Sequence, residues 1–289
     1  MYTPEAYVAL MTLLKSEGYR FVSFEAVSSE VAAERVICLR HDIDYCPAWA
    51  VAMARLNHHC GIAGLFTVQL RSPLYNLAAA ETLRCLADIE ALGQQIGLHF
   101  AFTAPPGDDA EAIAAQVIGD YRIACSLVPT LRPVFSWHNP SLAPGLIERC
   151  LDLDVPGMIN LYGRRFCRDM DYRADSNWRY SLEAWNAIAR DGHPRMQLLF
   201  HPFQWLARGT SMLDVLGRTF ATVARSCERE FLTNHLYRAA YPAGLPPEAF
   251  RSWERAICPV GSPPAPPDER TSSRPPEPPH SDAPPDQPG

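Results

Sequence analysis

Short apolar runs that alternate with helical segments constrain the fold of this 289-residue chain more than any other feature. The runs typical of buried strands cover residues 36–40, 61–70, 95–102, 133–138 and 196–201. Segments with helical spacing of apolar residues lie between them, at 47–58, 76–92, 110–127, 143–150 and 181–190, while residues 172–180 look irregular. Near-continuous apolar strands separated by helices predict a mostly parallel sheet covered by helices, and the number of units favours an α/β barrel.

The C-terminal segment has a different composition. From residue 259 onward it is dominated by proline, serine and charged residues, as in S-P-P-A-P-P-D-E-R-T-S-S-R-P-P-E-P-P at 262–279. Such a segment buries too little apolar surface to fold, so we expect a disordered tail at 259–289. Residues 1–258 then have a length typical of a single α/β barrel domain.

Charge and hydropathy restrict the partners and the location. A formal net charge of −6 provides no general basic field, which argues against nucleic acid or an anionic membrane and favours a small partner. No run of 18 apolar residues and no basic-then-apolar N-terminus is present, so we expect no membrane span or signal peptide and a cytoplasmic location. The nine cysteines are scattered singly, which indicates reduced thiols.

Two aspartates follow the first long strand, in the stretch V-I-C-L-R-H-D-I-D-Y at 36–45. Side chains alternate along an extended chain, so Asp42 and Asp44 point to the same face. Neighbouring carboxylates repel each other unless a cation or a proton separates them, which suits a divalent metal with one ligand and one base. The alternative is a solvated turn in which Asp44 caps the helix beginning near Pro47.

Three further strands end at or near a histidine: His99, His138 and His201. A single histidine is most often an ordinary hydrogen-bonded residue. In a barrel, however, the carboxyl ends of the strands meet at one mouth, where catalytic groups lie. Together with Asp42 and Asp44, these histidines would offer oxygen and nitrogen ligands to a zinc-like ion and leave groups over for proton transfer.

Six motifs occur along the chain in a fixed order: R-H-D-I-D at 40–44, L-R-S-P-L-Y-N at 70–76, I-G-L-H-F at 96–100, F-S-W-H-N-P-S at 135–141, D-S-N-W-R at 175–179 and L-L-F-H-P at 198–202. In this order they resemble the polysaccharide deacetylases with the NodB homology fold, the carbohydrate esterase family 4 type, in the branch with an R-H-D-x-D first motif. The resemblance covers most of residues 1–240 and implies a distorted (β/α) barrel.

The resemblance also implies an activity, metal-assisted hydrolysis of an N-acetyl or similar group on a sugar. Asp42 would be the general base that deprotonates the attacking water, and His201 would be the general acid that protonates the leaving amine. Asp44 and His99 would be ligands of a divalent metal, with zinc the expected ion. The partner would therefore be a carbohydrate substrate.

The second motif departs from the family pattern, because the family supplies two histidines four residues apart. Here His99 is followed by Phe100, Ala101, Phe102 and Thr103, so the second ligand is absent. His138 is the candidate substitute, with Asn139 orienting it or binding substrate. The alternative for His138 is a substrate contact or a structural bond to the segment around Asp175.

The remaining candidates are substrate-binding or orienting residues. Arg40 is a candidate partner for Asp42, whose pKa it would hold low. Asp175, Asn177 and Arg179 form a polar group suited to positioning Asp42 or His201. Three tryptophans, at 137, 178 and 205, are suited either to stacking on sugar rings or to packing.

Three functions are compatible with these residues. The first is a metal-dependent carbohydrate deacetylase that acts on a sugar or polysaccharide precursor. The second is a catalytically inactive protein of the same fold that binds a glycan or a partner in surface-polysaccharide assembly. The third is a carboxylate-pair glycoside hydrolase that uses Asp42 and Asp175 and would release reducing sugar instead of acetate.

Overall fold

The computed structural model describes residues 1–27, 35–102, 109–140 and 145–246, and the tail expected at 259–289 lies outside these ranges. The contacts divide the chain into two units, residues 1–233 and residues 234–289. The first unit contains the sheet and the candidate site. In the second unit the described residues form helix α10 (His235–Ala240), which begins where the Asn234 side chain accepts hydrogen bonds from the N–H groups of Leu236 and Tyr237.

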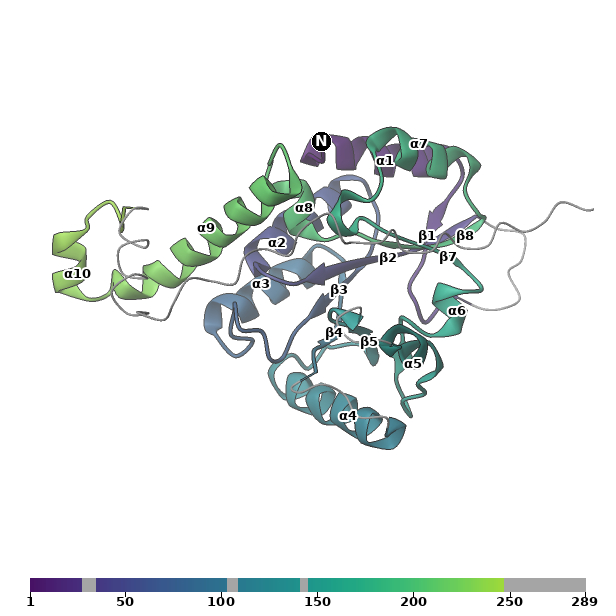
Figure 1. Cartoon of the computed structure of the whole chain (residues 1–289), viewed down its shortest axis with the longest axis horizontal. Helices are drawn as coiled ribbons and strands as arrows, with labels where there is room; N and C mark the ends of the chain where they lie inside the picture. Colours follow the sequence, from purple (N-terminus) through teal and green to yellow (C-terminus); the bar gives the residue numbers. More distant parts are fainter. Residues whose placement is uncertain (28–34, 103–108, 141–144, 247–289) are drawn as a thin grey trace, which may run out of the picture. The chain divides into compact units, whose positions relative to one another are not determined.

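Eight parallel strands form one sheet in the first unit (Figure 1). They are β1 (Arg20–Phe21), β2 (Val36–Ile43), β3 (Leu65–Val68), β4 (Gln95–Phe100), β5 (Val134–Trp137), β6 (Ile159–Asn160), β7 (Asp171–Ala174) and β8 (Arg195–Leu199). Their order is β6-β5-β4-β3-β2-β8-β7, and β1 pairs with the beginning of β2. The sheet curls but stays open between β6 and β7, so the expected distorted barrel is confirmed in this open form.

Helices connect the strands and cover the sheet. They are α1 (Pro4–Ser16), α2 (Pro47–His59), α3 (Ala80–Ala91), α4 (Ala110–Leu127), α5 (Leu146–Asp152), α6 (Arg164–Cys167), α7 (Leu182–Asp191), α8 (Pro202–Leu206) and α9 (Met212–Phe231). Local sequence signals explain several starts: the side chains of Thr3, Asp109 and Ser181 each accept a hydrogen bond from a first-turn N–H. In the part of the chain that the structure describes, no helix is long and apolar enough to cross a membrane.

Strand β2 lies at the centre of the sheet and brings the first motif into the core. All eight of its residues are buried, because β3 and β8 flank it, α2 and α8 pack against it, and residues of the curled sheet such as Val134 and Leu161 pack with Cys38 on the inner face. The register places Asp42 beside Thr67 of β3 and places His99 of β4 beside Ser136 of β5. Parallel neighbours in register point to the same face, so polar side chains gather at the carboxyl ends of the strands.

The structure differs from the sequence-based expectations in three elements. The helix expected at 76–92 begins only at Ala80, since the Asn76 side chain accepts a hydrogen bond from the N–H of Ala78 and closes a turn there. The segment 172–180, expected to be irregular, begins with β7, which pairs with β8 along its whole length. Asp44 does not cap α2, because the N-cap is Cys46 and no side chain bonds the first turn.

Candidate active site

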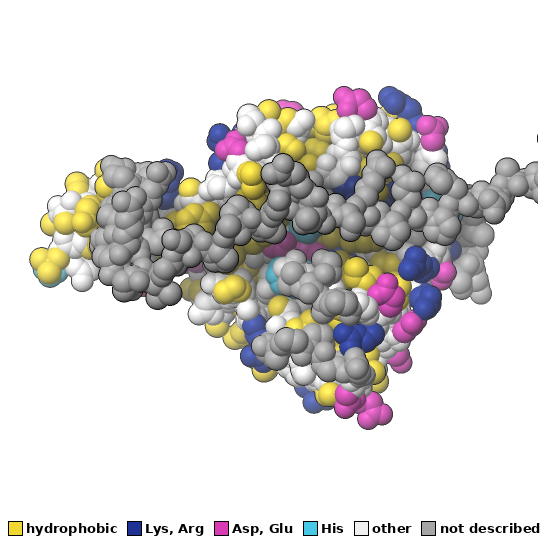
Figure 2. Space-filling view, viewed as in Figure 1, with side chains coloured by type: hydrophobic (Ala, Val, Ile, Leu, Met, Phe, Trp, Pro, Cys, Tyr) yellow, Lys and Arg dark blue, Asp and Glu magenta, His cyan; other side chains and the backbone are white. Residues whose placement is uncertain are grey.

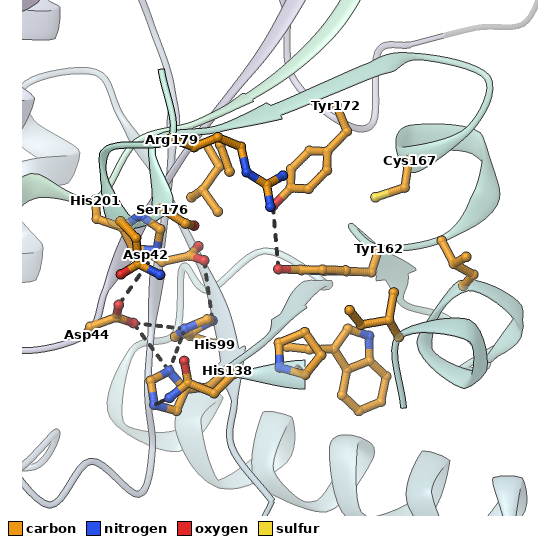
Figure 3. Close-up of a pocket in the computed structure, with 18 of the residues that line it drawn as sticks. Asp42, Asp44, His99, His138, Tyr162, Cys167, Tyr172, Ser176, Arg179 and His201 are labelled. Carbon is orange, nitrogen blue, oxygen red and sulfur yellow. Dashed lines mark hydrogen bonds and ion pairs between the residues drawn. The ribbon is translucent and has the colours of Figure 1, made fainter. Parts of the chain in front are cut away.

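A cavity of about 420 Å³ opens at the carboxyl ends of the strands (Figure 3). Its lining combines the aspartates and histidines of the motifs with an apolar and aromatic wall that includes Trp137, Leu151, Tyr162 and Tyr172. In the space-filling view, acidic and histidine side chains lie together near the middle of the face (Figure 2). The convergence expected from the strand ends is therefore present.

Asp44, His99 and His138 form the tightest group in the cavity. The Oδ1 atom of Asp44 lies 3.1 Å from Nε2 of His99 and 3.3 Å from Nδ1 of His138. The two ring nitrogens lie 3.1 Å apart (Figure 3). Among the described residues this trio is the group of histidine, cysteine or acidic side chains arranged to hold a metal ion.

The spacing of these donor atoms fits a divalent cation. A tetrahedral zinc site with bonds of about 2.0–2.1 Å has ligand atoms separated by roughly 3.3 Å. The three measured separations lie close to that value, and one carboxylate with two imidazoles is a usual zinc donor set. The structure therefore brings His138, the candidate substitute for the missing histidine, within reach of Asp44 and His99.

Each of the two histidines of the trio has a partner on its other ring nitrogen. Nδ1 of His99 lies 2.6 Å from the Ser136 hydroxyl, and Nε2 of His138 lies 2.9 Å from the Asn139 side-chain amide. Such contacts orient metal-binding imidazoles and select their tautomer. The expected orienting role of Asn139 is consistent with this geometry, although the amide must present its oxygen when Nδ1 of His138 binds a cation.

Asp42 lies beside the trio and is held by two neighbouring side chains. Its Oδ1 atom lies 3.0 Å from Nε of Arg40 and accepts a 2.6 Å hydrogen bond from the Thr67 hydroxyl. Burial acts to raise the pKa of Asp42, but the Arg40 guanidinium and nearby imidazoles hold it below its usual value. The expected Arg40–Asp42 pair is present, and the carboxylate is ionised.

Arg40 is itself fully buried, and aromatic rings surround its guanidinium. Its central carbon lies 5.0 Å from the centroid of the Tyr162 ring and 5.9 Å from that of Tyr172. Tyr162 follows β6 and Tyr172 lies in β7, and their hydroxyls are 3.5 Å apart at the open side of the sheet. Cation–π contact compensates in part for the loss of water around the guanidinium.

His201 follows β8 on the opposite wall of the cavity. Its Nδ1 lies 2.5 Å from Oδ1 of Asp175, while its Nε2 lies 3.7 Å from Oδ2 of Asp44. Burial acts to lower the pKa of His201, but the carboxylates of Asp175, Asp44 and Asp42 outweigh it and raise this pKa to about 9. His201 is therefore protonated at neutral pH.

Other candidates divide into pocket-lining and packed residues. Asn139, Asn177 and Arg179 line the cavity at exposed positions, and the structure gives Asn177 and Arg179 no bond to Asp42 or His201. Trp205 is fully buried, stacks on Tyr2 and donates its indole N–H to Asp175, so it cannot stack on a sugar. Trp137 is also buried and stacks on Phe102, although its edge reaches the cavity.

Thr67, Ser136, Tyr162 and Tyr172 were not among the candidates selected from the sequence, although Ser136 lies within the fourth motif. They carry no charge and belong to apolar runs or to segments without a regular pattern. Only the register between neighbouring strands brings the two hydroxyls of Thr67 and Ser136 to Asp42 and His99. A hydroxyl residue near the end of a predicted strand was the one available signal.

The fold and cavity define an open α/β protein in which an aspartate and two histidines lie together beside a buried carboxylate and a protonated histidine. No family model and no curated protein matches the sequence. The solved structures with a similar fold include deacetylases of the CE4 family, the family that the motifs resemble.

Three of these structures illustrate the degree of similarity. A peptidoglycan deacetylase of Bdellovibrio bacteriovorus matches with a TM-score of 0.40 and 16% identity, over 73% of this chain and 54% of that chain. A CE4 family pseudoenzyme from Bacillus anthracis matches with a TM-score of 0.41 and 16% identity, over 77% of each chain. The chitin deacetylase of Colletotrichum lindemuthianum matches with a TM-score of 0.38 and 13% identity, over 66% of this chain and 84% of that chain.

This similarity is too low to transfer an activity. The chain spans about half the length of the Bdellovibrio protein, and one of the three structures is a pseudoenzyme. The function has to follow from the geometry of the site itself.

Proposed function

We propose that this chain is a metal-dependent hydrolase that removes an acetyl or similar N-acyl group from a sugar or polysaccharide precursor. The observation that carries the proposal is the convergence of Asp44, His99 and His138, whose donor atoms all lie within 4.8 Å of one another. Asp42 and His201 line the same cavity beside this trio. Asp42 would supply the base, and His201 would supply the acid.

The cation would be held by Asp44, His99 and His138, and zinc suits this donor set best. When bound, a divalent cation supplies Lewis-acid chemistry, which polarises a carbonyl and lowers the pKa of water. Three protein ligands leave room for substrate, as is usual in catalytic sites.

Asp42 has the features of a general base. Its Oδ1 is occupied by Thr67 and Arg40, whereas Oδ2 lies 3.9 Å from Nδ1 of His99. Oδ2 is therefore available to take a proton from a water in the cavity. Arg40 keeps the carboxylate ionised and in place, since a charged partner fixes both its pKa and its direction.

His201 has the features of a general acid. Its Nδ1–H is engaged by Asp175, so the proton on Nε2 is the one that faces the cavity, on the side of Asp44. A protonated imidazole in this position would deliver its proton to the leaving amine. The base lies on β2 and the acid follows β8, so the two groups approach the substrate from different directions.

The mouth of the cavity suits a sugar. Asn139, Asn177 and Arg179 are exposed there and offer amide and guanidinium groups to hydroxyls. Asn139 and Asn177 have left-handed backbone conformations, with φ of 48° and 54°. Such conformations are uncommon outside glycine and are often retained at functional sites.

The test measures acetate released from N-acetylated oligosaccharides by the zinc-loaded chain. We expect zinc-dependent acetate release, and loss of that release in Asp42→Asn with zinc binding retained. Asp171→Asn, on β7 outside this cavity, is the matched control and keeps its activity.

Two results would contradict the proposal. A chain that binds oligosaccharide and releases no acetate with zinc, cobalt or manganese would support the inactive glycan-binding alternative. Release of reducing sugar in place of acetate would support a glycoside hydrolase.

A further inference from the structure

We infer that Thr67 and Ser136 are positioning residues, whose hydroxyls form a one-way hydrogen-bond chain that keeps the proton of His99 on Nδ1 and its Nε2 free for the cation. The inference rests on the proposed function only where it treats Nε2 of His99 as a ligand. These hydrogen bonds join His99 to the carboxylate of Asp42.

The distances form an unbroken chain. Nδ1 of His99 lies 2.6 Å from the Ser136 hydroxyl oxygen, which lies 3.1 Å from the Thr67 hydroxyl oxygen. The Thr67 oxygen lies 2.6 Å from Oδ1 of Asp42. Each of these is a normal hydrogen-bond length.

Counting protons sets the direction of the chain. An ionised carboxylate only accepts, so the single proton of the Thr67 hydroxyl goes to Asp42. Ser136 then donates its one proton to the Thr67 hydroxyl oxygen, 3.1 Å away, or to Oδ1 of Asp42 itself, 3.5 Å away. In either case Ser136 has no second proton for His99, so its oxygen accepts there and Nδ1 of His99 is the donor.

The proton of His99 could also lie on Nε2, and the hydrogen bonds from Thr67 and Ser136 are needed to prevent this. Nε2 of His99 lies 3.1 Å from Oδ1 of Asp44, and without other constraints a proton on Nε2 would bridge that gap. A proton there blocks the lone pair that a cation needs. Hydrogen bonds that place the proton on Nδ1 let His99 present Nε2 as a ligand without first changing tautomer.

Burial makes this hydrogen-bond chain rigid. Thr67 and Ser136 have no solvent exposure, and His99 and Asp42 are each 2% exposed. Thr67 on β3 is in register with Asp42 on β2, and Ser136 on β5 is in register with His99 on β4. The pairing of the strands therefore holds these distances. A buried network with few partners keeps its direction because a reversed bond would leave a polar atom unpaired.

The first experiment locates the protons of His99 directly in the zinc-free protein. Two-bond ¹H–¹⁵N correlation spectra of ¹⁵N-histidine-labelled full-length chain, recorded at pH 8, separate protonated from unprotonated ring nitrogens. We expect His99 Nδ1 to carry a proton in the wild type. A His99 with unprotonated Nδ1 and protonated Nε2 would overturn the inference, and this measurement needs no variant that has to fold.

The second experiment measures zinc affinity by calorimetry. We expect Ser136→Ala and Thr67→Val to weaken zinc binding about 10- to 100-fold, the usual effect of removing a partner of a ligating histidine. Thr67→Ser keeps the hydroxyl and restores wild-type affinity. Thr219→Val removes a buried hydroxyl that bonds only a backbone carbonyl within α9, and so controls for the loss of a hydroxyl as such.

The outcomes separate this inference from the proposed function. Wild-type zinc affinity in folded Ser136→Ala and Thr67→Val, shown by unchanged circular dichroism, would overturn the positioning role even if the enzyme is active. Conversely, Nδ1 protonation and weaker zinc binding would stand even if no acetate is released from any sugar.

Discussion

The Nδ1 atom of His201 lies 2.5 Å from Oδ1 of Asp175, and the other oxygen of that carboxylate accepts the backbone N–H of the same histidine. Trp205 donates its indole N–H to this second oxygen as well, at 2.9 Å. Asp175 has no solvent exposure, so its charge is compensated almost entirely by these neighbours. The pair therefore fixes the orientation of the imidazole and favours its protonated form.

Asp175→Asn should move the alkaline limb of the pH–rate profile. With the pKa of His201 raised to about 9, the acid form is present below pH 9, and activity is lost as pH rises through that value. Removing the adjacent negative charge lowers this pKa by about 1–3 units, so the limb shifts to lower pH and kcat falls about 100-fold. The profile of kcat against pH checks this, and an unmoved alkaline limb would show that another group is the acid.

Changing a ligand should remove the cation. Asp44→Ala and His138→Ala each delete one donor of the trio, and we expect zinc affinity to fall by at least about 100-fold, since three donors are few to begin with. Zinc content after dialysis and calorimetric titration measure this. His58→Ala, an exposed histidine on α2, is the control and should bind zinc as the wild type does. Wild-type zinc content in His138→Ala would rule out its assignment as a ligand.

Arg40→Leu should destabilise the fold as well as abolish activity. The substitution leaves the buried Asp42 carboxylate without its cationic partner, which typically costs about 3–5 kcal/mol. Urea unfolding monitored by circular dichroism gives the difference. The comparison is Arg164→Leu, which removes an exposed pair with Asp152 and should leave the free energy of unfolding nearly unchanged, because water screens exposed charges.

His41 should make the protein sensitive to acid. It is fully buried, Asn57 donates to its Nε2 and its Nδ1–H bonds the carbonyl of Phe200, so burial lowers its pKa to about 4. A lowered histidine pKa means that its contribution to stability is complete above about pH 6.5 and is lost as pH falls towards 4. The loss amounts to about 3 kcal/mol over that range.

The test for His41 compares the pH dependence of unfolding in the wild type and in His41→Gln. Glutamine cannot take up the proton, so the variant starts less stable but loses stability less steeply between pH 6.5 and pH 4, by up to about 1.4 kcal/mol per pH unit. Parallel slopes in the two proteins would show that other groups cause the acid sensitivity.

The order of strands and helices was predictable because apolar periodicity is a local property. Asp42, Asp44, His99, His138 and His201 were correctly placed at strand ends for the same reason, since each follows a recognisable apolar run. Strand β7 was not predicted, because its residues are only partly buried at the edge of the sheet and show no clear pattern. Of the two roles considered for Trp205, packing is the one that the structure shows, and the sequence could not separate them because a tryptophan looks the same in sequence whether it packs or binds.

The sequence alone determined which residues can carry the chemistry and that parallel strands would bring them to one end of a sheet, because side-chain alternation and strand polarity are set by consecutive residues. Tertiary structure decided which of them meet. Only the register between strands places Nδ1 of His138 3.1 Å from Nε2 of His99 and brings Thr67 and Ser136 between His99 and Asp42. Those distances depend on how separate segments pair and pack, and no local pattern encodes them.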